Sequence, residues 1–286
     1  MIIRENVIEV EGYDEIDMLE VNGEKCKPEE LIFFDLEHYV YKKPKCIGVF
    51  GACIYNNIDK KLYVTQYMIE NKSEVVDILL LAKKYFIKMK REGKKVIVTF
   101  AGNNDFTVIK YLFNKYGIYF DFEKEFKSID IQKEYEKDMK ISIGLKNLEK
   151  IFEVYREGDV ISGSNLAKTF HKVLKDKEYI QRMPKEKIET ILQYNEQDVV
   201  NLYKIFINWK NYIKTEEDTK ENDDFDEIKE IKTEQIINDI KEIDNEKNIE
   251  DVKKEQENNT NDNIIIIEDN GQQEENKEID NSETII

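Results

Sequence analysis

Two acidic residues, Asp35 and Glu37, lie two positions apart inside the apolar stretch LIFFDLEHYV. Side chains alternate between the two faces of a β-strand, so both carboxylates point to the same face. Ionised carboxylates in a buried strand are unfavourable unless a positive charge neutralises them. Hard divalent cations such as Mg²⁺ prefer oxygen ligands. The pair therefore predicts a divalent metal site on one face of a buried strand.

Two further acids occupy positions that fit the same site. Asp105 follows the apolar run KVIVTF and the turn AGNN, so it lies at the carboxyl end of a predicted strand, where α/β sheets place active sites. An aspartate at this point is also a favourable helix N-cap, and the two roles are compatible. Asp198 follows Tyr194 by one helical turn in ILQYNEQDVVNLYKIF, which places both on one helix face. Taken alone, Tyr194 also fits a half-buried core position, and Asp198 a solvated one.

Together these side chains meet the requirements of phosphodiester hydrolysis by two metal ions. Two hard cations about 4 Å apart need several oxygen ligands, and a polar group must orient the attacking water. We predict that Asp35, Glu37, Asp105 and Asp198 are catalytic and bind two Mg²⁺ or Mn²⁺ ions. Tyr194, one turn before a ligand, is the predicted catalytic group that orients the water. The sequence has no GxxxxGK[ST], GxSxG or HExxH motif and no cysteine–histidine zinc spacing, so other chemistries lack a comparable residue set.

An α/β fold is expected to bring these residues together. Apolar runs bounded by turn residues predict strands at 31–40, 46–55, 61–69, 95–100 and 118–122, with a shorter alternating segment at 7–10. Amphipathic spacing and capping residues predict helices at 73–91, 105–116, 142–152, 164–175 and 184–212. This order predicts a mixed sheet of five to six strands flanked by helices, with an antiparallel meander at one side.

Charge divides the chain into two parts. Residues 214–286 contain 26 acidic and 9 basic residues, whereas residues 1–213 contain 35 of each, so the net charge of −17 belongs to the tail. A neutral first part is compatible with nucleic acid binding, which a strongly acidic surface would oppose. The tail has too little apolar surface to offset its chain entropy, and we expect it to be mostly disordered, with transient helix at about 226–254. We expect an N-terminal extension at 1–29, a catalytic domain at 30–213 and the acidic low-complexity tail at 214–286.

Remaining features of the sequence bear on partners and location. The run Ile264–Ile267 in the tail fits either compositional drift or a short docking strand for a protein partner. No stretch reaches the roughly 18 apolar residues that span a bilayer, and the N-terminus has no apolar signal region. Cys26, Cys46 and Cys53 show no CxxC or other metal-ligand spacing, and their odd number suits a reducing compartment. These features lead us to expect a cytoplasmic protein with no membrane association.

Three motifs in the chain resemble those of a known nuclease superfamily. FFDLE, VTFAGNND and LQYNEQDVVNL are similar to the three exonuclease motifs of the DEDD superfamily. The separations of 70 residues from Asp35 to Asp105 and of 93 residues from there to Asp198 are of its usual order. The spacing of Tyr194 and Asp198 resembles the tyrosine subclass, because the histidine subclass has a histidine where this chain has Gln193.

A closer resemblance, over about residues 30–210, is to the YprB-like branch of ribonuclease H-like domains, through ISIGLKNLEKIF and YNEQDVVNL. It implies a ribonuclease H-like fold and 3′–5′ exonuclease activity on a single-stranded 3′ end of DNA or RNA. The chain departs from the family at Asn104, where an aromatic residue is usual, and this affects substrate stacking or loop shape. Lys146 fits either an approach to a phosphate or a solvated helix position. His38 and His171 do not match the position of a catalytic base, and each fits a packing or surface role.

A second interpretation is a nuclease-fold module that binds nucleic acid or recruits a partner, with weak or no catalysis. The neutral charge of residues 1–213 and the departure at Asn104 favour it. The intact set of four acids disfavours it, since a degenerate site readily loses a ligand.

Overall fold

The computed structural model of the protein describes residues 1–158 and 161–214. The expected tail helix at 226–254 and the apolar run Ile264–Ile267 lie outside the described residues. No helix among the described residues is long and apolar enough to cross a membrane.

A mixed six-stranded sheet forms the centre of the described part, in the order β1-β6-β5-β4-β7-β8. Its strands are β1 (Ile2–Glu9), β4 (Leu31–Tyr41), β5 (Lys43–Asn56), β6 (Lys61–Met68), β7 (Val96–Thr99) and β8 (Lys127–Asp130), and a separate two-stranded hairpin consists of β2 (Glu20–Val21) and β3 (Glu24–Lys25). β1, β6, β5 and β4 pair antiparallel, whereas β4, β7 and β8 pair parallel. The predicted α/β fold with a mixed sheet and an antiparallel meander is therefore confirmed.

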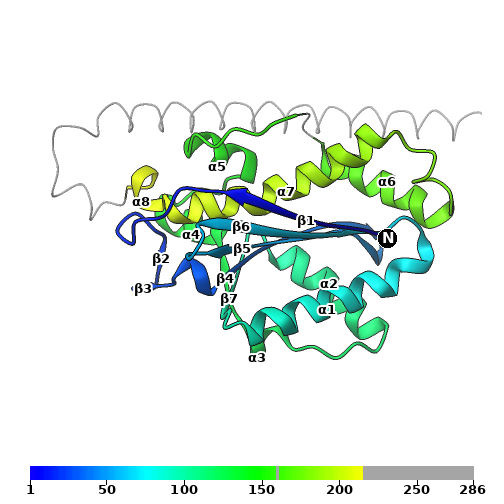
Figure 1. The fold of residues 1–286 in the computed structure, drawn as a ribbon, viewed down its shortest axis with the longest axis horizontal. Helices are drawn as coiled ribbons and strands as arrows, with labels where there is room; N and C mark the ends of the chain where they lie inside the picture. Colours follow the sequence, from blue (N-terminus) through cyan, green and yellow to red (C-terminus); the bar gives the residue numbers. More distant parts are fainter. Residues whose placement is uncertain (159–160, 215–286) are drawn as a thin grey trace, which may run out of the picture. The chain divides into compact units, whose positions relative to one another are not determined.

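Helices cover both faces of this sheet, with α1 and α2 on one side and α6 and α7 on the other (Figure 1). The helices are α1 (Val75–Arg91), α2 (Asn103–Lys115), α3 (Phe122–Glu125), α4 (Ile131–Met139), α5 (Leu145–Ile151), α6 (Gly163–Lys175), α7 (Lys185–Ile207) and α8 (Trp209–Tyr212), with short 3-10 turns at Pro28–Glu30 and Lys72–Glu74. Because both faces are covered, Leu31 to Phe34 at the start of β4 are fully buried. An unbroken apolar run suits such a strand.

The N-terminal segment differs from the expectation. The predicted short strand at 7–10 is instead the eight-residue β1, Ile2–Glu9, which pairs along its whole length with β6. Part of the segment that we expected to be an extension at 1–29 thus supplies an edge strand of the sheet.

The predicted strand at 118–122 is wrong. Residues 118–121 form no strand, Phe122 begins α3, and the edge strand is β8 at Lys127–Asp130. Phe120 and Phe122 pack with Phe86 and Phe113 in an aromatic cluster. The apolar run 118–122 therefore contributes aromatic side chains to the core, whereas the polar segment KSID forms the strand that pairs with β7.

Several helix boundaries also differ. The predicted helix at 142–152 begins only at Leu145, and the last helix ends at Ile207, before the separate α8. The sequence analysis missed α4, which Asp130 caps by accepting a hydrogen bond from the backbone N–H of Gln132. The carboxylate of Asp130 also accepts a hydrogen bond from the backbone N–H of Ala101, at a distance of 2.9 Å. It thereby holds the turn that leads into α2.

Candidate metal centre

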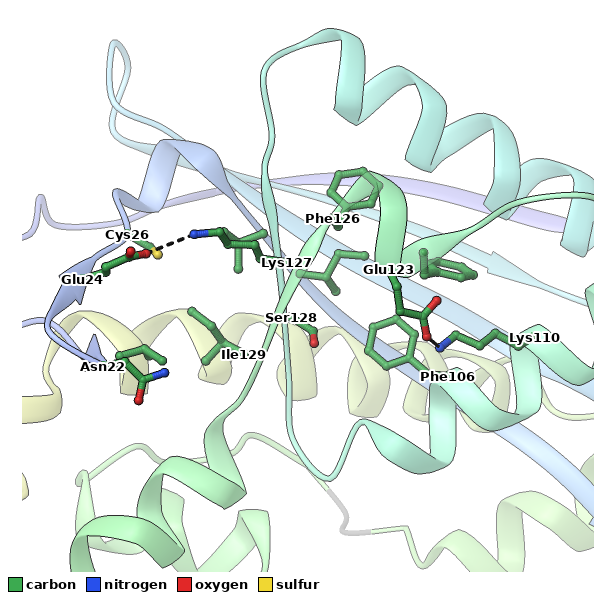
Figure 2. Close-up of a pocket in the computed structure, with 14 residues that line it drawn as sticks. Asn22, Glu24, Cys26, Phe106, Lys110, Glu123, Phe126, Lys127, Ser128 and Ile129 are labelled. Atoms are coloured by element: carbon green, nitrogen blue, oxygen red, sulfur yellow. Dashed lines mark hydrogen bonds and ion pairs between the residues drawn. The ribbon is translucent and has the colours of Figure 1, made fainter.

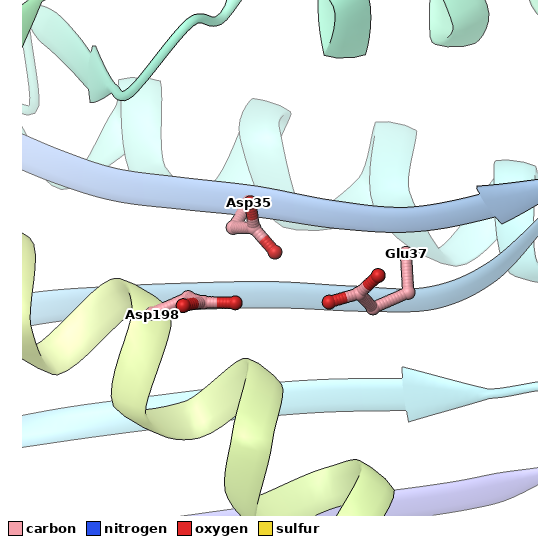
Figure 3. Close-up of side chains that lie close together, drawn as sticks. All are labelled: Asp35, Glu37 and Asp198. Carbon is pink, nitrogen blue, oxygen red and sulfur yellow. The ribbon is translucent and has the colours of Figure 1, made fainter. Parts of the chain in front are cut away.

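Three of the four predicted ligands meet above the sheet. Asp35 and Glu37 project from the same face of β4, and Asp198 faces them from α7 (Figure 3). Each offers one carboxylate oxygen, and these oxygens all lie within 4.8 Å of one another. The period-2 alternation of β4 aligns the first two, and the packing of α7 across β4, β5 and β6 brings the third.

Asp105 lies beside this group but is not part of it. It is the third residue of α2, whose N-cap is Gly102, so its alternative role as an N-cap is not what the structure shows. Its side chain is buried, and its Oδ1 lies 3.9 Å from Nε2 of His38. The charge of Asp105 nevertheless contributes to the raised pKa of Glu37. Its role as a metal ligand stays a prediction.

Burial and mutual repulsion make the acidic group receptive to a cation. Burial raises the pKa of Asp35 to about 6. The hydrogen bond from Asn195 and the positive charge of Arg156 lower this pKa and partly offset the effect of burial. Burial, and next the charge of Asp35, hold the pKa of Glu37, Asp105 and Asp198 well above their ordinary values. Converging carboxylate oxygens that resist ionisation are a donor set that a hard divalent ion stabilises, because the ion replaces protons as the countercharge. The residues present therefore fit divalent metal binding.

Asp35 is fixed by an amide network that sequence reasoning missed. Asn195 Nδ2 donates to Asp35 Oδ2 at 2.9 Å, and Gln66 Nε2 donates to Asn195 Oδ1 at 2.8 Å and to the backbone oxygen of Leu192 at 2.8 Å. Gln66 and Asn195 are both fully buried. Gly51 lies opposite Asp35 in the β4–β5 pairing and leaves the space that Asn195 occupies. The network sets the direction in which the Asp35 carboxylate points.

Asp198 is fixed by Arg156, which the sequence analysis also missed. Arg156 lies in the irregular segment after α5, and its Nη2 donates to Asp198 Oδ1. Its Nε and Nη2 also donate to the two oxygens of Glu149, at 2.7 and 2.6 Å. Glu149 is buried in turn and accepts a further hydrogen bond from Asn201 Nδ2 at 2.9 Å. Arg156 lies outside the helices and strands, so no periodic pattern in the sequence marks it. The sequence hints only at its partner, because Glu149 lies among the apolar positions of α5.

Tyr194 lies close to two cations in the pocket of the acidic group. The guanidinium carbon of Arg156 is 5.0 Å from its ring centroid, and Lys146 Nζ is 5.1 Å from it. Lys146 Nζ also donates to the backbone oxygen of Ile161 at 3.3 Å, so this lysine is part of the site's surroundings and is not freely solvated. Burial, and next the charges of Asp198 and Glu37, raise the pKa of Tyr194. Its hydroxyl therefore keeps its proton at neutral pH.

Comparison with known proteins agrees with this geometry. Residues 32–210, which include all of β4 except Leu31, all of α7 and every residue of the acidic group, match the RNase H superfamily. The chain belongs to the RNase H superfamily. No curated protein shows significant similarity to the chain. Superfamily membership and a carboxylate group suited to metal ions together fit a nuclease.

The RNase H domain has a pocket directly at its acidic group. The pocket has a volume of about 360 Å³. Besides Asp35, Glu37 and Asp198, its lining includes Phe100, Lys146, Asn147, Arg156 and Tyr194. The site thus combines acids that suit metal ions with cations that suit phosphate groups.

A larger hollow of about 550 Å³ lies elsewhere in the described part of the chain, along β8 and beside Glu24 and Cys26 (Figure 2). Phe106 and Phe122 line it, and its charged residues pair with each other, Lys127 with Glu24 at 3.1 Å and Lys110 with Glu123. Among the described residues, the converging group of three acids lines the smaller pocket and not this one.

The remaining candidate residues lie around this site. His38 is half-buried, with its Nε2 beside Asp105, and is not one of the converging ligand residues. His171 packs edge-on against Tyr39, with ring centroids 5.1 Å apart, as expected for a packing residue. Asn104 is exposed in the first turn of α2.

Proposed function

We propose that the protein is a metal-dependent 3′–5′ exonuclease that hydrolyses single-stranded DNA or RNA with two Mg²⁺ or Mn²⁺ ions. The observation that carries the proposal is the convergence of Asp35, Glu37 and Asp198 within 4.8 Å in a pocket that Tyr194 also lines. The likeness of the three motifs to the tyrosine subclass of the DEDD superfamily supports the same assignment, and so does the likeness to YprB-like domains. We place the catalytic domain at 30–213, with β1 as an added edge strand.

Each residue has a distinct task in this proposal. Asp35, Glu37 and Asp198 would hold the metal ions, with Asp105 as a further ligand beside them. Bound divalent ions lower the pKa of water and stabilise the charge on a leaving oxygen. The protonated hydroxyl of Tyr194 orients the attacking water by a hydrogen bond. Asn195 and Arg156 keep the carboxylates of Asp35 and Asp198 in fixed directions.

The size of the pocket supports action at a strand end. A volume of about 360 Å³ is near the lower limit for small-molecule sites. A pocket of this size can hold one terminal nucleotide, which is what removal of single nucleotides from a strand end requires.

The test is shortening of a single strand labelled at its 5′ end. With Mn²⁺, the wild-type protein should produce a ladder of products that keep the label, and a strand blocked at its 3′ end should persist. Asp35→Asn and Asp198→Asn should show no detectable shortening, because each removes a charged ligand. Glu186→Gln, an exposed position on the same helix as Asp198, is the matched control and should retain full activity. Equal activity in all three variants would refute the proposal.

The second candidate is a nuclease-fold module that binds a strand without cutting it. One contact favours it, because Arg156 already neutralises part of the acidic group through Asp198. This candidate predicts that the wild-type protein binds the labelled strand and leaves its length unchanged with either Mg²⁺ or Mn²⁺.

A further inference from the structure

Arg156 has one donor group without a partner. Its side chain is only 9% exposed, and its Nη1 is buried without a hydrogen-bond partner. Buried, unsatisfied polar groups cost roughly 1–3 kcal/mol, and more when charged. Several other buried side-chain atoms in the described residues lack partners, but Arg156 is the only one of those residues that lines the metal pocket. An unsatisfied buried donor needs a partner that the described residues do not supply, such as a water molecule or an anion.

The guanidinium of Arg156 is held rigidly in place. Both oxygens of Glu149 bind its Nε and Nη2, and Asn201 anchors Glu149 in turn. One face of the guanidinium is near the ring of Tyr194. These contacts fix the plane of the group, so Nη1 has a set direction before any ligand arrives. Such preorganisation lowers the cost of binding.

The chemistry of the surroundings selects the ligand. A planar guanidinium matches the oxygens of phosphate groups, and its charge persists at any working pH. Lys146 supplies a second positive charge to the same pocket, on the ring of Tyr194. A phosphodiester is the anion that must approach the carboxylates of the site if they act in strand hydrolysis.

We infer that Arg156 binds the scissile phosphate of the strand, with Nη1 donating to a non-bridging oxygen while Nε and Nη2 stay on Glu149 and Asp198. The inference rests on the proposed function, because it names the group that the same site recognises. Arg156 is then a substrate-contacting residue, and Glu149 and Asn201 are its positioning residues. Arg156 then contacts both Asp198 and the phosphate, so one side chain positions the metal-binding carboxylate and the substrate relative to each other.

The test separates phosphate recognition from a purely structural role. Calorimetry with saturating Mn²⁺ gives the dissociation constants of thymidine 5′-monophosphate and of thymidine, and their ratio measures the contribution of the phosphate. Arg156→Lys keeps the positive charge but lacks the planar guanidinium with its fixed donor directions. We expect it to lower this ratio about tenfold, as for one hydrogen bond to a charged group. Thymidine binding and Mn²⁺ affinity should change less than about threefold. Arg182→Lys, an exposed arginine paired with Asp176, is the control and should leave the ratio unchanged.

A second variant covers the case in which Arg156→Lys does not fold. The double substitution Arg156→Gln with Glu149→Gln removes a buried cation together with its buried partner Glu149. Asp198 also loses its contact with Arg156, and the Mn²⁺ in the assay supplies its countercharge. The double variant should also lose the phosphate contribution while Mn²⁺ still binds. An unchanged ratio in the variants, or a wild-type protein that binds thymidine as well as its monophosphate, would overturn the inference. Because no cleavage is measured, phosphate binding through Arg156 without strand shortening would reject the proposed exonuclease and keep this inference.

Discussion

Each carboxylate of the acidic group has its own polar environment. Asp35 accepts a hydrogen bond from the neutral amide of Asn195, whereas Asp198 pairs with the cation Arg156. The pKa of Asp35 rises to about 6, and that of Asp198 lies well above its ordinary value, because both carboxylates are buried. These partners fix the direction of the carboxylates and still leave them in need of a countercharge.

Tyr194 offers a direct test at the scale of one atom. Tyr194→Phe removes only the hydroxyl that we assign to the attacking water. We expect kcat to fall about 10²-fold, the lower range for a positioned proton donor or acceptor, with Mn²⁺ affinity unchanged. Strand-shortening rates and calorimetry measure the two quantities. Tyr119→Phe, at a tyrosine that is 80% exposed, is the control; loss of Mn²⁺ binding in Tyr194→Phe would contradict the assignment.

The sequence predicted the acids better than it predicted their partners. The pair Asp35 and Glu37 stood out because a strand otherwise buried on both faces rarely carries two charges. Arg156 gave no signal, since it lies in an irregular segment and reaches Asp198 across 42 positions in the chain. Asn195 appeared only as part of the YNEQD segment, and its bond to Asp35 depends on how α7 crosses the sheet.

At the scale of elements, the site depends on the close approach of α7 to β5. An ideal Cβ on Gly51 would lie 2.1 Å from Asn195 Oδ1, and one on Gly48 would lie 2.3 Å from the ring of Phe170 on α6. Glycine at these positions lets both helices pack closely on the sheet. Neither contact follows from the sequence pattern, which shows only two glycines in an apolar strand.

Substitution of these two glycines separates packing from catalysis. Gly51→Ala and Gly48→Ala should each lower the free energy of unfolding by about 1–3 kcal/mol, as overpacking does. Only Gly51→Ala should also reduce kcat, by about tenfold or more, because the displaced Asn195 no longer orients Asp35. Urea unfolding and strand shortening below the melting temperature measure the two effects. An equal loss of kcat in Gly48→Ala would show that general loosening, and not Asn195, is responsible.

Element prediction failed where packing overrode local pattern. The run IYFDF has the composition of a strand, yet Phe120 and Phe122 fill an aromatic cluster around Phe86. The true edge strand β8 is short and mostly polar, and its parallel pairing to β7 is set by contacts distant in sequence. β1 was underestimated because its apolar residues do not alternate with polar ones: Ile3 and Val7 are exposed, whereas Arg4 and Asn6 lie on the half-buried face.

At the scale of the whole molecule, the acidic group lowers the stability of the metal-free fold at neutral pH. The pKa of Asp35 is 3.8 when unperturbed and about 6 in the fold, so its contribution is favourable below about pH 4 and is lost as pH rises through 6. Glu37, Asp105 and Asp198 shift in the same direction. Metal-free protein should therefore lose stability from these groups as the pH rises towards neutrality.

Asp35→Asn should reveal this dependence. In EDTA at about pH 7, the variant should be more stable than the wild-type protein by at most about 3 kcal/mol, and the difference should shrink towards pH 4. With Mn²⁺ the order should reverse, because only the wild-type protein gains from the bound ion. Thermal unfolding across this pH range measures both effects. A wild-type protein more stable than Asp35→Asn at every pH in EDTA would contradict the account.

The most direct test of the metal centre is calorimetric titration of the protein with Mn²⁺. Wild-type protein should bind about two ions per chain, in keeping with a two-metal site. Asp35→Asn should bind more weakly by at least tenfold, whereas Glu186→Gln should match the wild type. Absence of Mn²⁺ binding by the wild-type chain, or undiminished binding by Asp35→Asn, would contradict the metal centre.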